Sequence, residues 1–219
     1  MKYENIRKIV LDTALETVSK GLIKGTSGNI GMRDAAEKNI IAITPSSVPY
    51  ESMSPADIAI VRMNEDGSND WIDGPYKPSS ELPLHTAVYR ARPEVNATIH
   101  THSMYATICA MGENPQLLPI TPPHCEFTPI GIVPFALPGS IDTANDIVKI
   151  LGKDGLVCLI KNHGMFSCGK DMLHAMYATE YTEEMAQTTV LAKTLGVYEP
   201  MKEEDVIKTK AFFANGMAV

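Results

Sequence analysis

Three histidines of this chain are spaced so that their imidazoles could share one metal ion. His100 and His102 stand one residue apart in "TIHTHS" (98–103), and His163 follows in "KNHG". Residues i and i+2 of a strand point to the same face, so the first two imidazoles can reach one ion. A catalytic zinc site commonly has three protein ligands and one open position. The alternative is an accidental pair, but His163 stands at a turn after an apolar segment, which favours the metal site.

The remaining histidines and the cysteines give weaker signals. His85 and His174 lie in segments with a helical pattern, which is typical of histidines in a core or on a surface. The four cysteines stand far apart, with no C-x-x-C pair. This spacing favours buried, reduced thiols over a metal or redox site.

Three turns rich in hydroxyl groups form a second group of candidates. They are "GTSGNI" (25–30), "TPSS" (44–47) and "PSSE" (78–81). Taken singly, each is an ordinary turn or helix cap. Together they indicate a monophosphate held by amides and hydroxyls, without lysine or arginine. No Lys-Ser/Thr follows the glycines, so the first turn is not a P-loop.

Glu81 stands directly after the paired serines of the third turn. A carboxylate between a phosphate pocket and a metal ion can act as a general base. The alternative interpretation is a glutamate in the first turn of a helix, where the helix dipole favours it.

Alternating strands and helices must position these residues. The pattern predicts "NATIHTH" as a strand with Thr98, His100 and His102 on one face. Ser79 or Ser80 is expected to cap a helix that runs to about Ala91, and Ser103 a helix to Met111. Further predicted helices cover about 3–20, 141–151 and 171–195, Gly216 closes a last short helix, strands cover 39–44 and 156–160, and proline makes 113–139 irregular.

Composition limits the class of protein. The chain has 219 residues, of which 44% are hydrophobic, and a formal net charge of -7. It can therefore fill one core, and its acidity argues against a nucleic-acid or anionic-membrane partner. No apolar run is long enough to span a bilayer, and no secretory h-region opens the chain. We expect one cytoplasmic domain over residues 1–219, of the α/β class, with a mixed or antiparallel sheet covered by helices.

The five motifs "GTSGNI", "TPSS", "PSSE", "HTH" and "NHG", in this order, resemble those of the class II aldolase/adducin-head family. The resemblance covers essentially the whole chain. It implies an α/β/α layered fold with a central, mainly antiparallel sheet, and a homotetramer with active sites at subunit interfaces.

By this resemblance, the chain would be a zinc-dependent aldolase with one Zn²⁺ per subunit, although imidazole sites also accept other divalent metals. It would cleave a ketose 1-phosphate, of the fuculose or 5-deoxypentulose type, to dihydroxyacetone phosphate and an aldehyde. The implied metal ligands are Glu81, His100, His102 and His163. Glu81 would leave the metal when substrate binds and move the proton on the reacting carbon. The implied phosphate contacts are Gly28, Asn29, Ser46, Ser47, Ser79 and Ser80.

Two positions depart from the family pattern. Fuculose-phosphate aldolases protonate the leaving aldehyde with a tyrosine, but the corresponding stretch here, "ITPPHCEF" (120–127), has none. His124 or Glu126 could take that part. The family usually has a glycine at the last position of the second turn, where this chain has Ser47.

Related activities remain open at this point. The family also contains L-ribulose-5-phosphate 4-epimerases and methylthioribulose-1-phosphate dehydratases. Epimerases usually have aspartate after the paired serines, so Glu81 favours an aldolase. A non-catalytic scaffold, as in the adducin heads, lacks the metal histidines that are present here.

Overall fold

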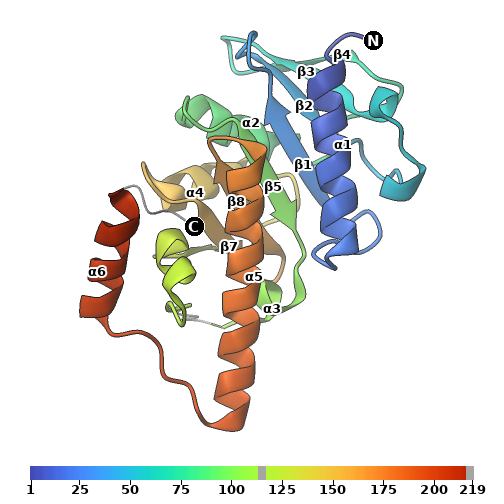
Figure 1. The fold of residues 1–219 in the computed structure, drawn as a ribbon. Helices are drawn as coiled ribbons and strands as arrows, with labels where there is room; N and C mark the ends of the chain where they lie inside the picture. Colours follow the sequence, from blue (N-terminus) through green and yellow to red (C-terminus); the bar gives the residue numbers. More distant parts are fainter. Residues whose placement is uncertain (113–116, 216–219) are drawn as a thin grey trace.

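An eight-stranded sheet runs through the molecule, as the computed structural model of residues 1–112 and 117–215 shows (Figure 1). The strand order is β4-β3-β2-β1-β5-β8-β7-β6. The strands are β1 Gly28–Arg33, β2 Ile40–Ile43, β3 Ala59–Met63, β4 Asn69–Asp73, β5 Ala97–Thr101, β6 Gly131–Val133, β7 Val157–Ile160 and β8 Gly164–Gly169. Within the described residues, β6 and β7 pair in parallel and the other neighbours are antiparallel. The predicted α/β/α fold with a mainly antiparallel sheet is confirmed.

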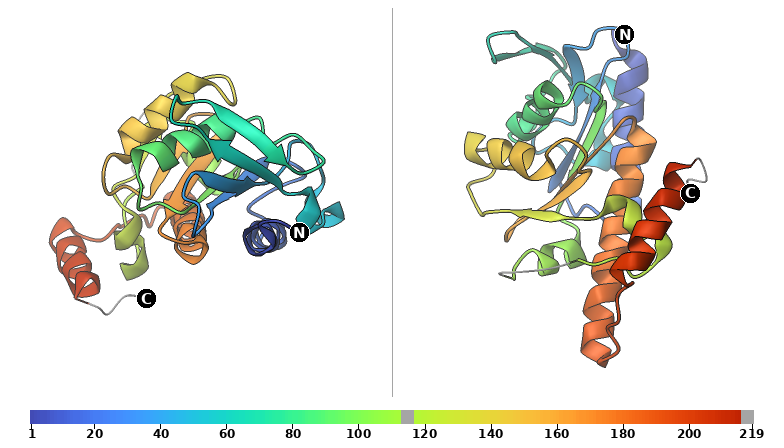
Figure 2. Two further views of the ribbon diagram at one scale, coloured as in Figure 1. Left: turned by 90° about the horizontal axis from the view of Figure 1, so that it is seen from above. Right: turned by 90° about the vertical axis from the view of Figure 1, so that its left-hand side faces the viewer.

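Helices cover both faces of the sheet (Figure 2). Helices α1 (Glu4–Ser19), α3 (Met104–Cys109) and α5 (Met172–Leu195) pack on one face, and α2 (Leu82–Ala91) and α4 (Ile141–Leu151) on the other. Helix α6 (Glu203–Ala214) lies outside these layers against the 3₁₀ helix η3 (Pro122–Phe127). Two further 3₁₀ turns, η1 (Tyr50–Ser52) and η2 (Pro55–Asp57), precede β3.

The alternation of side chains along β1 and β5 separates an apolar face from a polar one. Ile30 and Ile99 pack into the core beneath α1. The intervening residues point the opposite way, towards α2, because successive side chains of a strand alternate between faces. The register pairs Asn29 with His100 and Gly31 with Thr98. Two central strands therefore carry polar side chains into the interior beneath α2.

Two predicted helix caps differ from the structure. The residue before α2 is Glu81, and Ser79 lies one turn earlier with its Oγ accepting the backbone N–H of Glu81. Ser103 does precede α3, but its hydroxyl contacts the Thr101 hydroxyl and makes no cap hydrogen bond. In both places Ser/Thr hydroxyls find nearer partners than the first free amides of the helix.

A partner from outside the helix caps α3 instead. The Glu183 carboxylate of α5 accepts the backbone N–H groups of Tyr105 and Ala106. Gly216, which was predicted to close the last helix, lies outside the described residues.

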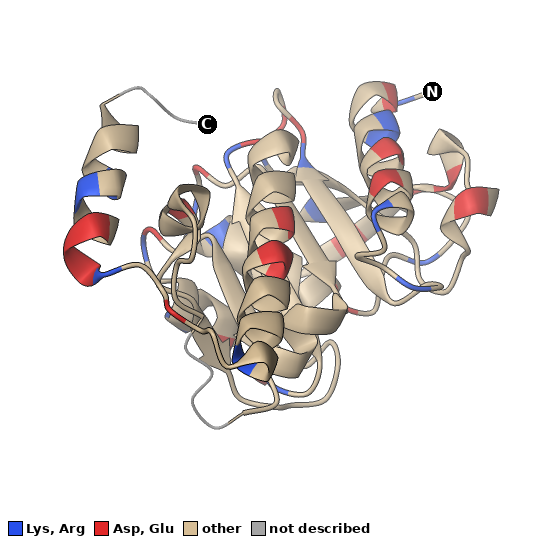
Figure 3. Ribbon diagram, turned by 60° about the horizontal axis from the view of Figure 1, so that its bottom comes forward, with Lys and Arg blue, Asp and Glu red and all other residues tan. Residues whose placement is uncertain are grey.

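Charged side chains are distributed over several elements. Basic and acidic residues are mixed along α1, whereas in α5 and α6 the acidic residues precede the lysines (Figure 3). None of the helices in the described part of the chain is long and apolar enough to cross a membrane.

Candidate active site

Four side chains meet at one end of the sheet. Glu81 comes from the N-terminus of α2, His100 from β5, His102 from the residue just past β5, and His163 from the turn between β7 and β8. One potential ligand atom from each lies within 4.8 Å of the others. We call these four residues the metal cluster. The structure thus brings together all four predicted metal ligands.

The turn that carries His163 depends on a glycine. A Cβ on Gly164 would lie 2.2 Å from the backbone oxygen of Thr101, so only glycine lets β8 begin this close to β5. Asn162, just before His163, has a φ of 53°, a left-handed conformation that asparagine tolerates better than most residues. The "NHG" motif is therefore a turn built to place an imidazole against the end of β5.

The ligand atoms of the metal cluster are close enough to share one ion. His100 Nε2 lies 3.1 Å from His102 Nε2 and 3.1 Å from Glu81 Oε2. His163 Nε2 lies 3.4 Å from Glu81 Oε1. Zinc with bonds of about 2.0–2.1 Å places tetrahedral ligands about 3.3 Å apart. These three separations lie near that value, and the ligand atoms of all four residues lie within 4.8 Å of one another.

Hydrogen bonds leave metal-binding atoms free. The Nδ1–H of His100 donates to the backbone oxygen of Met165 at 2.8 Å, which leaves Nε2 with its lone pair facing the cluster. Glu81 Oε1 is buried without a hydrogen-bond partner in the described part of the chain. A buried carboxylate oxygen without a partner is costly unless a cation or donor meets it. These donors therefore fit a divalent metal.

The ionisation states are also those of metal ligands. Burial, followed by the charges of His100 and His163, lowers the pKa of His102 to about 4. Burial and His100 also lower the pKa of His163. For Glu81, burial acts to raise the pKa, but hydrogen bonds and charge from His100, together with Asn29 and His163, hold it well below the usual range. Neutral imidazoles and a carboxylate are the forms that bind zinc.

A second row of polar side chains braces Glu81. Asn29 Nδ2 donates to Glu81 Oε2 at 2.9 Å, and His85 Nε2 lies 2.5 Å from Asn29 Oδ1. The interpretation of His85 as a core or surface histidine missed this contact with the site. A sequence signal was present, because Glu81 and His85 are four residues apart and so share one face of α2.

The hydroxyl-bearing turns lie beside the metal cluster. The N–H of Ser79 donates to the Thr44 oxygen at 3.1 Å, and the N–H of Ser46 to the Lys77 oxygen at 2.9 Å. These bonds place "TPSS" against "PSSE" at the N-terminus of α2. Ser46 is half-buried and Ser79 is buried, whereas Ser47 and Ser80 are exposed. We call these four serines the hydroxyl turns.

The other two predicted phosphate contacts, Asn29 and Gly28, and also Ser47, have features of their own. The side-chain amide of Asn29 is already engaged by Glu81 and His85. The Gly28 oxygen accepts the Tyr50 hydroxyl at 2.5 Å. Ser47 has a φ of 60°. That left-handed conformation suits a glycine, and a serine in it is strained.

Neither predicted proton donor joins the metal cluster in this chain. His124 is fully buried, and its Nδ1 accepts the N–H groups of Ile120 and Thr121 at 3.3 Å each. Burial lowers its pKa despite the nearby Glu184. A substrate cannot reach a fully buried ring. Glu126, two residues on, is exposed.

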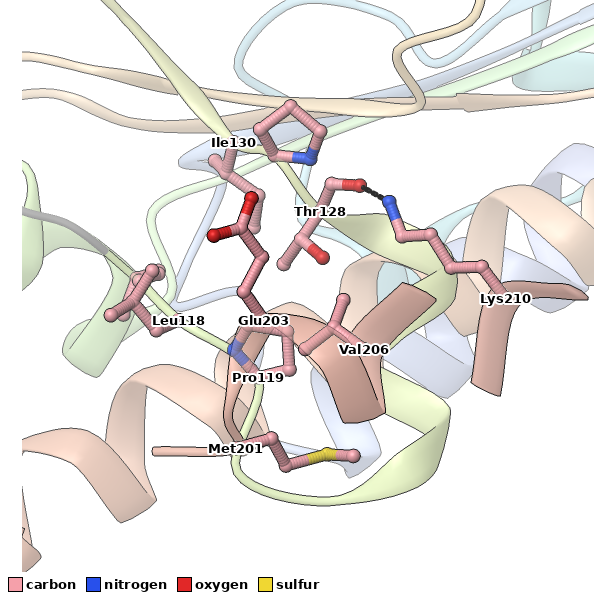
Figure 4. A pocket seen from close by; sticks show the side chains of 10 residues that line it. Leu118, Pro119, Thr128, Ile130, Met201, Glu203, Val206 and Lys210 are labelled. Atoms are coloured by element: carbon pink, nitrogen blue, oxygen red, sulfur yellow. Dashed lines mark hydrogen bonds between the residues drawn. The ribbon is translucent and has the colours of Figure 1, made fainter. Parts of the chain in front are cut away.

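A cavity of about 630 Å³ lies apart from the metal cluster, between the segments around β6 and α6 (Figure 4). Apolar residues such as Leu118, Ile130 and Val206 line most of it, and the Lys210 ammonium donates to the Thr128 oxygen at its edge. No residue of the metal cluster lines this cavity. We therefore place the candidate catalytic site at the metal cluster and not in this cavity.

The family follows from a match over most of the chain. The model of the family described as "Class II Aldolase and Adducin N-terminal domain" matches residues 8–190. The chain belongs to this family. The resemblance predicted from the five motifs is thereby confirmed.

Individual relatives agree with this assignment. An "L-fuculose phosphate aldolase" of Methanococcus maripaludis is 33% identical over 175 residues, which cover 79% of this chain and 89% of the relative. A "5-deoxy-D-ribulose 1-phosphate aldolase" of Bacillus thuringiensis serovar kurstaki is 31% identical over 94% of both chains. The solved structure of an "L-fuculose 1-phosphate aldolase" superposes with a TM-score of 0.84 at 25% identity and covers 98% of both chains.

Proposed function

We propose that this class II aldolase-family enzyme, a lyase, uses Zn²⁺ to cleave a ketose 1-phosphate of the fuculose or 5-deoxypentulose type. The products would be dihydroxyacetone phosphate and an aldehyde. The observation that carries the proposal is the metal cluster, three imidazoles and a carboxylate, set directly beside the hydroxyl turns. The two curated relatives named as aldolases support the same reaction class.

Glu81, His100, His102 and His163 are the residues that would hold the metal. When bound, a divalent ion supplies a Lewis acid that stabilises the negative charge left on the triose-phosphate half when the carbon–carbon bond breaks. Zinc is proposed because imidazole and carboxylate ligands at tetrahedral spacing suit it, although such sites also accept other divalent metals. Metal analysis of the purified protein would identify the ion and its ratio to the chain.

Glu81 would move the proton. In cleavage, the hydroxyl of the departing half loses its proton as it becomes the aldehyde, and the electron pair of the broken bond stays on the other carbon. The low pKa of Glu81 keeps it unprotonated before the reaction. Glu81 would take up the proton that the hydroxyl releases, directly or through a second acid–base group, and pass it to that carbon, so that no net proton is gained or lost.

The hydroxyl turns would hold the phosphate. Ser79 and Ser80 precede α2, and amides at a helix N-terminus attract an anion. Ser46, Ser47, Gly28 and Asn29 complete the proposed set. Asn29 donates one N–H of its amide to Glu81, and its second N–H would be the one available to the phosphate.

The assembly is also part of the proposal. We propose a homotetramer with active sites between subunits, because His102 and His163 leave one side of the cluster partly open. Exposed Glu126 stays a candidate proton donor, reaching a neighbour's site. Four free thiols support a reducing, cytoplasmic setting. Light scattering would test the tetramer, and a Glu126→Gln variant the donor.

A substrate panel tests the reaction. The zinc-loaded protein would be mixed with fuculose, rhamnulose and 5-deoxyribulose 1-phosphates, with dihydroxyacetone phosphate detected by a coupled reductase. We expect triose phosphate from at least one sugar. Its absence from all of them would overturn the aldolase proposal. Turnover of L-ribulose 5-phosphate or methylthioribulose 1-phosphate without triose phosphate would indicate an epimerase or a dehydratase instead.

A further inference from the structure

A chain of hydrogen bonds runs from Glu81 into the interior beneath α2. Its members after Glu81 are Asn29, His85, Thr98 and Tyr89, which we call the relay. Beyond the two contacts already described, His85 Nδ1 lies 2.6 Å from Thr98 Oγ1, and Tyr89 Oη lies 2.7 Å from the same oxygen. All four residues are buried.

The elements of the fold impose this line of side chains. Glu81, His85 and Tyr89 are spaced by four residues, so they follow one face of α2. Thr98 and His100 share one face of β5, and Asn29 and Gly31 share one face of β1. Helix α2 and strands β5 and β1 therefore bring these side chains into contact in the interior beneath α2.

The absence of a side chain at Gly31 makes room for the relay. A Cβ there would lie 3.0 Å from His85 Nδ1, and 3.2 Å from both Thr98 Oγ1 and Tyr89 Oη. Any other residue would push against the three atoms that form the inner bonds. The missing side chain at Gly31 thus leaves the space in which the inner hydrogen bonds of the relay form.

Only one arrangement of hydrogen-bond donors and acceptors along the relay satisfies Glu81 as a carboxylate. A carboxylate only accepts, so Asn29 must present its NH₂ to Glu81 and its oxygen to His85. That oxygen also only accepts, so His85 must carry its proton on Nε2. Neutral His85 then accepts at Nδ1 from the Thr98 hydroxyl, which in turn accepts from Tyr89. Burial, then the charge of His100, lowers the pKa of His85 to about 3, which keeps the ring neutral.

We propose that His85, whose Nε2–H donates to Asn29 and whose Nδ1 accepts from Thr98, is a positioning residue that fixes the amide of Asn29 so that only N–H faces Glu81. The residue touches no substrate and acts through Asn29. Its effect on turnover rests on the proposed role of Glu81, whereas its tautomer and its effect on metal affinity do not. Without this brace, the Asn29 amide could turn its oxygen towards Glu81 and repel the carboxylate from its place in the metal cluster.

Matched variants test the proposal. Thr98→Val removes the donor to His85 at constant shape, and Thr98→Ser retains it. Thr179→Val is the control, since Thr179 is an equally buried hydroxyl that bonds to Ser167 at 2.6 Å on the other side of the sheet. We expect Thr98→Val to lower kcat and zinc affinity about tenfold, at the lower end for residues that orient metal ligands, with a smaller change in KM. Thr98→Ser and Thr179→Val should keep both.

A double-mutant cycle tests whether His85 acts through Asn29. His85→Phe alone should lower kcat about 10–100-fold. Combined with Asn29→Ala, it should lower kcat no further than Asn29→Ala alone. Independent, multiplying effects of the two substitutions would overturn the proposal. Should His85→Phe fail to fold, the three threonine variants carry the test.

The tautomer can be observed without any turnover. Protein labelled with ¹⁵N in histidine, compared with His85→Phe or Thr98→Val to assign the ring, should show the His85 proton on Nε2. A proton on Nδ1 would overturn the proposal. This spectrum and the zinc affinity stay readable even if no sugar phosphate is cleaved, so failure of the aldolase proposal and failure of the relay give different results.

Discussion

The metal cluster and the hydroxyl turns lie next to each other, but they are held in different ways. Behind the metal cluster, Glu81 and His100 are buried and bonded to Asn29, His85 and the Met165 oxygen. In the hydroxyl turns, Ser47 and Ser80 are exposed, and Ser46 and Ser47 are 3.5 Å apart with only a marginal hydrogen bond. The side chains of the first region are held by hydrogen bonds within the chain, whereas the exposed hydroxyls of the second region face solvent.

This difference suggests a division of tasks. Proton transfer tolerates little displacement, so its groups gain from a rigid setting. A phosphate has several equivalent oxygens and can be held by exposed hydroxyls in more than one way. Substitutions in the metal cluster should therefore reduce kcat, and substitutions in the hydroxyl turns should mainly raise KM.

Glu81→Gln is expected to have the largest effect. The amide keeps the shape but cannot take up a proton, so kcat should fall by about 10²–10⁴-fold while folding is retained. Steady-state kinetics at saturating substrate would measure it. Glu183→Gln is a matched control, because its half-buried carboxylate only caps α3 and should leave kcat unchanged. Near-normal turnover of Glu81→Gln would remove Glu81 from proton transfer.

Low pH should lower the free energy of unfolding through His85, which lies behind the metal cluster. His85 has a pKa of about 3 in the fold against 6.5 ordinarily, so only the unfolded chain takes up its proton between these values. The free energy of unfolding of chelator-treated protein should therefore fall with falling pH, by about 3 kcal/mol from His85 between pH 6.5 and 4. Urea titrations of the parent and His85→Phe at several pH values measure the difference. Equal pH dependence in both would contradict the assignment.

Ser80→Ala should affect the phosphate side alone. If this exposed hydroxyl bonds to the phosphate as proposed, its removal should raise KM about tenfold. The change should leave kcat and zinc content close to the parent values, because no residue of the metal cluster depends on this hydroxyl. Ser52→Ala removes another exposed hydroxyl, which bonds to the Pro49 oxygen, and serves as the control. A fall in kcat with constant KM would contradict the division.

Ser47→Gly should have the smallest effect. Glycine adopts a φ of 60° without strain, so the free energy of unfolding should rise by about 1 kcal/mol. Ser46→Gly is the contrasting variant, since Ser46 has no positive φ and glycine there should lower the stability. Denaturant unfolding of both would measure the pair, and the same sign for both would contradict the interpretation of strain.

The three histidines of the metal cluster could be predicted from the sequence because each is set by a local pattern, whereas Glu81 was implied as a ligand only by the family resemblance. His100 and His102 follow strand alternation, and Gly164 marks the turn that carries His163. His85 could not be recognised in the same way, since its function depends on Thr98 and Asn29, which come from other elements. The spacing of residues along a helix does not show which strand the helix will cover.

The caps and the proton donor show the same limit. Ser79 and Ser103 have the residue type of a helix cap, but neighbouring groups in the fold engage their hydroxyls. His124 has a suitable residue type for acid–base chemistry, yet it is enclosed by its own subunit. In each case the residue type suited the predicted role, but contacts in the folded chain engaged or buried the side chain. The extent of the single domain over residues 1–219 stays a prediction.

Gly31 restricts how this protein can diversify. Even a methyl group at this position would press on His85, Thr98 and Tyr89 at once, so each of them would have to shift by a few tenths of an ångström. Exchanges at the four relay residues are equally interdependent, because each must match the donor or acceptor of its neighbour. Single exchanges in the interior beneath α2 are thus disfavoured, while the exposed Ser47 and Ser80 are not part of this chain of hydrogen bonds. New substrate preferences should therefore arise from substitutions at exposed residues of the site, while the buried relay residues stay the same.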